Sequence, residues 1–132
     1  MTMEYRKDTH RVHLCIAHIV FCPKYRRPVL IGKVKERFEQ VVEALAKAKG
    51  WDILEIAVQP DHVHIFIRFN ADDSPHKVVK AIKGKTSNQL RKEFPELVTK
   101  LPTLWTRSYF VATAGIVSQE AIQRYIEEQK GK

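Results

Sequence analysis

Runs of apolar residues with strand or helix spacing divide the chain into a series of elements with clear ends. Gly50 offers a stop for one helix, and Ser74 followed by Pro75 starts another, because serine caps a helix N-terminus and proline fits its first turn. The pattern predicts strands over residues 11–22, 52–58, 62–69 and 109–113, helices over 33–49, 75–94 and 119–130, and a loop over 95–106.

The order βαββαβ, followed by one more helix, predicts an α+β protein with a ferredoxin-like (RRM-like) fold. Such a fold has an antiparallel sheet with two helices on one face, and we expect the other face to be open for a partner. Residues 11–22 are apolar at both parities, as in a strand that is covered on both faces. With 132 residues the chain has room for one core, so we expect a single domain over 1–132.

The charge balance favours a polyanionic partner, either nucleic acid or an anionic membrane surface. The chain holds 23 Lys and Arg against 15 Asp and Glu, a net charge of +8. No apolar run approaches the roughly 20 residues that span a bilayer, and the start does not resemble a secretory signal. Cys15 and Cys22 should point to opposite faces of one strand, so we expect no disulfide and a cytoplasmic location. The basic residues that we favour as contacts if the partner is a nucleic acid are Lys24, Arg26, Arg27, Lys83 and Lys85.

The strand over residues 62–69 carries the first candidate chemistry. Its odd positions are all apolar, whereas its even positions begin with His62 and His64. Residues two apart lie on the same face about 6.6 Å apart, so two imidazoles so placed can converge on one metal ion. The alternative is a pair of surface histidines with no ligand. The other histidines lack a shared face with obvious partners, and we interpret His18 as structural; they are His10, His13, His18 and His76.

The last helix carries the second candidate pair. Gln129 lies four residues after Tyr125, on the same face one turn later. By composition alone, Tyr125 is a packing residue with its hydroxyl at the rim of the core. A tyrosine nucleophile beside a polar metal ligand is the alternative.

Four segments in matching order resemble the small single-tyrosine HUH transposases of insertion sequences, the TnpA family, which is related to the REP-associated tyrosine transposases. The resemblance covers about residues 9–130 and rests on HIVFCPKYRRPVL (18–30), QPDHVHIFI (59–67), LWTRSYFVATAGIVS (104–118) and IQRYIEEQ (122–129). It implies that His62, His64 and Gln129 bind a divalent ion, Mg²⁺ or Mn²⁺, and that Tyr125 is the nucleophile. Many relatives have two adjacent glycines before the last helix, where this chain has Ala114-Gly115-Ile116; we expect Gly115 to serve as the hinge.

The resemblance also implies a reaction and an assembly. Members cut and rejoin single-stranded DNA with hairpin ends through a 5′-phosphotyrosine, and act as homodimers whose tyrosine helix can dock against the histidine strand of the partner. We expect exposed sheet edges to pair between chains, and the long apolar strand at 11–22 is a candidate for such pairing. No separate general base is evident.

Two other functions stay open from the sequence. A non-catalytic module that binds single-stranded DNA or RNA would suit an RRM-like sheet, although such modules place aromatic residues where His62 and His64 stand. A domesticated or replication-type HUH nuclease would share the chemistry but serve another role. Neither a Walker loop nor a convergent acidic triad is apparent.

Overall fold

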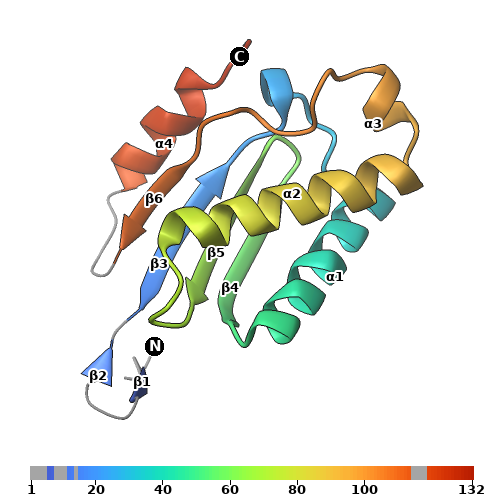
Figure 1. Ribbon diagram of the computed structural model, residues 1–132. Helices are drawn as coiled ribbons and strands as arrows, with labels where there is room; N and C mark the ends of the chain where they lie inside the picture. The colour runs from blue at the N-terminus through green and yellow to red at the C-terminus, as the bar shows by residue number, and fades with distance from the viewer. Residues whose placement is uncertain (1–5, 8–11, 14, 114–118) are drawn as a thin grey trace.

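The computed structural model describes residues 6–7, 12–13, 15–113 and 119–132 (Figure 1). The predicted hinge at Gly115 lies outside the described residues, as do His10 and the side chain of His13. The strands are β1 (Arg6–Lys7), β2 (Val12–His13), β3 (Ile16–Phe21), β4 (Asp52–Gln59), β5 (His62–Arg68) and β6 (Phe110–Thr113). The helices are α1 (Gly32–Lys49), α2 (Pro75–Glu93), α3 (Glu96–Thr99) and α4 (Gln119–Glu128), with a 3₁₀ turn, η1, at Lys24–Arg26.

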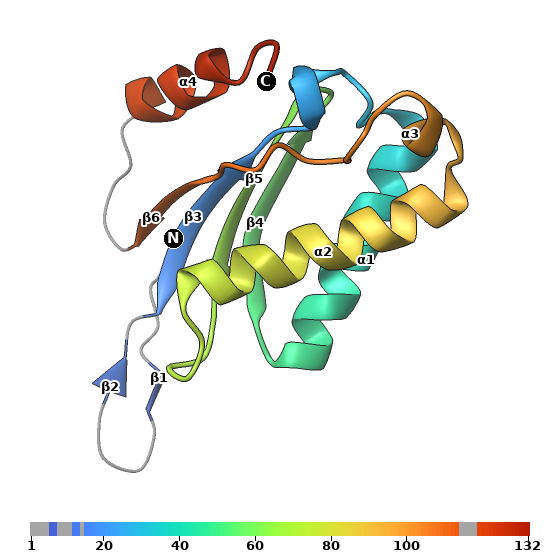
Figure 2. The same cartoon turned by 45° about the horizontal axis from the view of Figure 1, so that its top comes forward.

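The main sheet has four strands in the order β4-β5-β3-β6, and every neighbouring pair is antiparallel. The chain order β3-α1-β4-β5-α2-β6 with this strand order is the ferredoxin-like arrangement. Helices α1 and α2 lie side by side on one face of the sheet (Figures 1 and 2). The α+β prediction is therefore confirmed.

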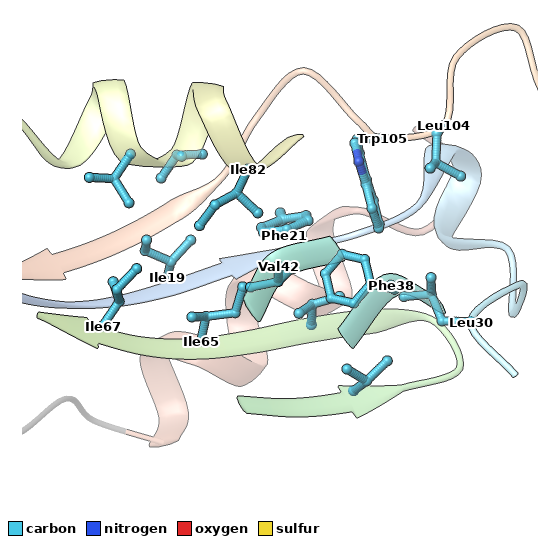
Figure 3. Close-up of a cluster of buried hydrophobic side chains, with 14 of the residues drawn as sticks. Ile19, Phe21, Leu30, Phe38, Val42, Ile65, Ile67, Ile82, Leu104 and Trp105 are labelled. Atoms are coloured by element: carbon cyan, nitrogen blue, oxygen red, sulfur yellow. The ribbon is translucent and has the colours of Figure 1, made fainter. Parts of the chain in front are cut away.

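The core lies between the sheet and these two helices. Alternate residues of the central strands, Ile19 and Phe21 on β3 and Ile65 and Ile67 on β5, are fully buried there (Figure 3). The Phe21 ring meets the edge of Trp105 with centroids 4.7 Å apart, a favoured aromatic geometry. Because successive side chains of a strand point to opposite faces, the even-numbered residues of both strands must face away from α1 and α2.

Helix α4 covers part of the face that was expected to be open. Val20 on β3 is fully buried against Ile122 and Ile126 of α4, with Phe110 and Tyr125 packed beside them. Figure 2 shows α4 on the side of the sheet opposite α1 and α2. The expectation was wrong at this point because the apolar stripe of α4 needs a surface to bury it, and Val20 supplies one.

Three further details differ from expectation. The strand predicted over 11–22 is broken: β2 pairs with β1, and β3 begins only at Ile16. β3 is an internal strand, so the sheet edges that could pair with another chain belong to β4 and β6. The loop predicted over 95–106 contains the single helical turn α3, which starts directly after Pro95.

Cys15 and Cys22 are both free thiols. None of the described helices is long and apolar enough to cross a membrane.

Candidate active site at the histidine strand and the tyrosine helix

His62 and His64 lie on the sheet face that α4 partly covers. Their neighbours in sequence Val63 and Ile65 are fully buried in the core under α1 and α2, which directs both imidazoles to the opposite face. Both histidines are half-buried. The same-face placement expected from the alternating pattern is therefore observed, while metal binding by the pair stays a prediction.

The His62 ring is held by its neighbour in sequence. Its Nδ1 lies 2.8 Å from Oδ1 of Asp61, and Oδ2 of Asp61 lies 3.2 Å from Nε of Arg26. A carboxylate paired with a guanidinium can only accept hydrogen bonds, so Nδ1 of His62 must carry the hydrogen. In the neutral ring this leaves Nε2 with a lone pair, the form that can bind a metal ion.

His64 has a partner that the sequence did not suggest. Its Nε2 lies 3.1 Å from Nδ1 of His18, and the His18 ring stacks on Phe66 with centroids 4.1 Å apart. The register explains this meeting, because His18 pairs with Phe66 and Val20 with His64 across β3 and β5. His18 therefore lies at the candidate site itself, and its interpretation as a structural residue stays a prediction. His18 and His64 both stand at even positions of neighbouring strands, and this shared parity is the sequence signal that could have indicated their contact.

Both of these imidazoles are biased toward the neutral form. Burial lowers the pKa of His64, and the neighbouring His18 and His62 lower it further, against a smaller opposing effect of Glu55. Burial likewise lowers the pKa of His18. Neutral imidazole nitrogens are the form that binds a divalent ion, so the donor set suits a metal.

Tyr125 and Gln129 meet at a third residue, Ser108. The Tyr125 hydroxyl lies 3.0 Å from Oγ of Ser108. The Ser108 hydroxyl in turn donates to Oε1 of Gln129 at 2.9 Å. Nε2 of Gln129 donates to the backbone oxygen of Tyr125 at 3.2 Å, which fixes Oε1 toward Ser108. Since the one hydrogen of Ser108 goes to Gln129, Tyr125 must be the donor to Ser108. The shared helical face expected for Tyr125 and Gln129 is thus observed.

The tyrosine is a neutral phenol in this arrangement. Burial raises the pKa of Tyr125 above its ordinary value, and the hydrogen bonds to Ser108 and Thr106 only partly oppose this shift. Tyr125 and Gln129 line a cavity of about 450 Å³ together with the basic residues Lys24, Arg107 and Lys132. Arg107 was not among the candidate residues, because it is an isolated basic residue between the predicted loop at 95–106 and the predicted strand at 109–113.

In the structure Gln129 is bonded to Ser108 and Tyr125 and makes no hydrogen bond to His62 or His64. Gln129 is only 5% exposed, and both ends of its amide are bonded within the cluster of Tyr125 and Ser108. Among the residues whose side chains are described, 15–112 and 119–132, no three His, Cys, Asp or Glu side chains gather closely enough to hold a metal ion. Arg26 links the histidine strand to α4. It pairs with Asp61, which contacts His62, and its Nη1 donates to the backbone oxygen of Ile126 in α4 at 3.1 Å.

The five basic residues favoured as DNA contacts have different surroundings. Lys24 lines the cavity of Tyr125, and both Lys24 and Arg27 lie over the ring of Tyr25. Lys85 is exposed. Arg26 and Lys83 are instead engaged within the protein: Arg26 pairs with Asp61, and Nζ of Lys83 donates to the backbone oxygens of residues 106, 107 and 108.

Lys83 gives a pH-dependent prediction for stability. Burial lowers its pKa from 10.5 to about 8, so between these values the unfolded chain binds more protons than the folded one. The contribution of Lys83 to the free energy of unfolding should therefore rise with pH across this window, while the raised pKa of the Cys22 thiol acts in the opposite direction. The slope should be more positive in the wild type than in Lys83→Met. Urea denaturation at several pH values measures both slopes. Lys85→Met, on the same helix but exposed, is the control and should keep the wild-type slope; equal slopes for all three proteins would contradict the prediction.

Comparisons with known proteins identify the family of this chain. The sequence model of the family described as "Transposase IS200 like" matches residues 11–129. The chain is 31% identical to the ISDra2 transposase TnpA of Deinococcus radiodurans over 134 aligned residues, covering all of this chain and 96% of that protein. It is 33% identical to the transposase for insertion sequence element IS200 of Salmonella typhimurium, over 87% of this chain and 76% of that protein.

Solved structures show the same relationship. A transposase crystal structure from Deinococcus radiodurans superimposes with a TM-score of 0.87 at 29% identity, over 96% of this chain and 99% of the other. The structure of a REP-associated tyrosine transposase bound to a REP hairpin shares the fold, with a TM-score of 0.57 at 13% identity over 92% of this chain and 69% of the other. The family match and the identity over the full chain decide against a non-catalytic binding module, and this chain belongs to the IS200-like transposases, the TnpA family of insertion-sequence enzymes.

Proposed function

We propose that this transposase, as one domain over residues 1–132, cleaves and rejoins single-stranded insertion-sequence ends through Tyr125. The observation that carries the proposal is the position of Tyr125 in a cavity with Lys24 and Arg107, on the helix whose last turn is tied to the histidine strand. The Tyr125 oxygen forms a bond to phosphorus, the bond from phosphorus to the 3′ oxygen breaks, and the phenol proton leaves as the 3′-hydroxyl gains one. A 3′-hydroxyl that later attacks the phosphotyrosine restores a phosphodiester without ATP.

A divalent ion, Mg²⁺ or Mn²⁺, fits the residues at the histidine strand. His62 offers Nε2 because Asp61 holds its Nδ1, and burial keeps His64 neutral. The amide oxygen of Gln129 is a neutral hard ligand and would complete the set once it leaves Ser108. When bound, such an ion offsets the negative charge that develops at the scissile phosphate.

Basic side chains at the cavity would position the DNA backbone. Lys24 and Arg107 line the cavity of Tyr125, and Arg27 and Lys85 are exposed cations outside it. Contacts of this kind are made mainly to phosphates and weaken steeply with salt. We therefore propose single-stranded DNA with hairpin ends as the substrate, with Lys24, Arg27 and Lys85 as candidate contacts.

The experiment that tests the proposal is a search for the covalent intermediate. The protein is incubated with single-stranded insertion-sequence ends and Mg²⁺ or Mn²⁺, and the mixture is run on a denaturing gel. A band that contains both protein and labelled DNA on the 3′ side of the cut is the expected result. DNA that is bound but never cleaved or attached, under conditions where a related transposase forms its adduct, would contradict the proposal.

Loss of a histidine ligand should weaken the response to metal. EDTA should stop cleavage reversibly, and His64→Ala should strongly lower the rate and raise the Mn²⁺ concentration that gives half of the maximal rate. Cleavage in single turnover at a series of Mn²⁺ concentrations measures both effects. His76→Ala is a matched control, because His76 lies on α2, where it bonds to the Tyr109 hydroxyl, and its loss should leave the Mn²⁺ response unchanged. Cleavage by His64→Ala that is independent of Mn²⁺ would rule out the ligand role.

A further inference from the structure

Arg26 and Asp61 join the candidate metal ligand to the tyrosine helix in one continuous chain of polar contacts. Nδ1 of His62 lies 2.8 Å from Asp61, Asp61 lies 3.2 Å from Nε of Arg26, and Nη1 of Arg26 donates to the backbone oxygen of Ile126 at 3.1 Å. A second oxygen of α4, on the Glu127 carboxylate, lies 3.8 Å from the same Nη1. Two nitrogens of one guanidinium thus serve two different elements.

The Asp61 carboxylate decides which nitrogen of His62 can act as a ligand. Because the carboxylate accepts and cannot donate, it holds the hydrogen on Nδ1 and leaves the lone pair on Nε2. A histidine with no such partner favours the opposite form, with the hydrogen on Nε2. Carboxylates that bond a metal-ligating histidine in this way fix both the tautomer and the ring orientation.

Arg26 is itself held firmly in place by the turn η1. Both Tyr25 and Arg26 have left-handed backbone angles, with φ of 60° and 54°, which residues other than glycine rarely adopt. The turn is fastened by backbone bonds from Lys24 to Leu104 and from Tyr25 to Lys132. The Arg26 side chain is only 18% exposed. An arginine fixed by surrounding structure at such a strained position is better suited to hold Asp61 than to reach for DNA.

We infer that Asp61 and Arg26 are positioning residues of this transposase: Asp61 sets His62 for metal binding, and Arg26 orients Asp61 while holding the last turn of α4. The inference rests on the proposed function only in that His62 is taken as a metal ligand. It gives Arg26 a role within the protein in place of the expected DNA contact, which stays an untested prediction, since two nitrogens of its guanidinium are engaged within the protein.

The tautomer of His62 can be read without DNA or metal. In mildly alkaline solution, ¹⁵N NMR of the wild-type protein should show His62 with its hydrogen on Nδ1. In Asp61→Ala the hydrogen should move to Nε2, and Arg26→Gln should give a mixture of the two forms. The ¹⁵N signals of His76, which lies on α2, serve as an internal reference and should not move. A wild-type His62 with its hydrogen on Nε2, or an unchanged spectrum in Asp61→Ala, would overturn the inference.

Metal affinity provides a second readout. Mn²⁺ binding followed by electron paramagnetic resonance should weaken roughly 10–100-fold in Asp61→Ala, with a smaller loss in Arg26→Gln and partial recovery in Arg26→Lys. The matched control is Arg37→Gln, which removes an arginine from an ion pair with Glu93 between α1 and α2 and should leave Mn²⁺ binding unchanged. Amide spectra of each variant check that the fold is intact. If Arg26→Gln weakens only DNA binding, Arg26 is a DNA contact and its positioning role is wrong.

This result is separable from the proposed function. The NMR readout can establish the role of Asp61 even if no covalent adduct forms. Conversely, an adduct at Tyr125 with an unchanged His62 tautomer in Asp61→Ala would keep the transposase mechanism and overturn the positioning role.

Discussion

Replacing Tyr125 with phenylalanine should eliminate DNA cleavage and the covalent adduct while leaving hairpin binding in place. The substitution removes only the hydroxyl, and that oxygen is the atom proposed to bond to phosphorus. The ring packs beside Phe110 and the buried side of α4, so phenylalanine fills the same space. The hydrogen bond to Ser108 is lost, which should lower the free energy of unfolding by about 0.5–1.5 kcal/mol. A denaturing gel measures the adduct, and a mobility shift with labelled hairpin measures binding.

The control for this experiment is Tyr25→Phe, which removes a hydroxyl from another tyrosine on the same side of the molecule. Its ring lies under Lys24 and Arg27, and phenylalanine keeps that contact. Cleavage should therefore continue in Tyr25→Phe. A covalent adduct formed by Tyr125→Phe at the wild-type rate would remove Tyr125 from the mechanism and require another nucleophile.

The fold could be predicted from the sequence because its signals are local. Ser74 accepts a hydrogen bond from the backbone of Lys77, and Gly50 adopts the left-handed conformation that ends α1. The alternation of β5 separates the core side from the histidine side within seven residues. Each of these features depends on residues that lie within a few positions of one another.

The covering of the sheet by α4 could not be predicted in the same way. The apolar stripe of α4 was visible in the sequence, but which face would bury it depends on the register of β3 within the sheet. Val20 and His18 share the even parity of β3, yet Val20 is buried by α4 whereas His18 meets Phe66 and His64. Only the positions of the neighbouring strands and of α4 distinguish these two surroundings.

The partners within the site are long-range for the same reason. Ser108 is 17 residues from Tyr125, His18 is 46 residues from His64, and Arg26 is 100 residues from Ile126. The motif residues His62, His64, Tyr125 and Gln129 could be named from the sequence because short segments around each pair carry the family resemblance. Asp61 adjoins His62 in the sequence, whereas Ser108, His18 and Arg26 come from other parts of the chain, and no spacing rule within one element identifies those three.

Mixing two inactive variants should restore cleavage if the active sites are shared between subunits. In the structure the hydroxyl of Tyr125 and the amide of Gln129 bond to Ser108 rather than to His62 or His64, and β4 and β6 leave two sheet edges available for pairing. We propose a homodimer in which the tyrosine helix of one chain serves the histidine strand of the other. Neither Tyr125→Phe nor His64→Ala should then cleave efficiently alone.

In a mixed dimer, one site combines intact histidines from the Tyr125→Phe chain with an intact tyrosine from the His64→Ala chain. The other site carries both lesions. When the two variants are mixed in equal amounts and exchange subunits freely, about half of the dimers are mixed. Each mixed dimer has one complete site out of two, so cleavage should return to about one quarter of the wild-type level. Mixing Tyr125→Phe with the double variant Tyr125→Phe/His64→Ala supplies no intact tyrosine and should restore nothing.

If every chain uses its own tyrosine, each site in the mixture of Tyr125→Phe and His64→Ala holds one lesion, and that mixture also stays inactive. A chain that is monomeric by light scattering at the assay concentration would exclude shared sites altogether.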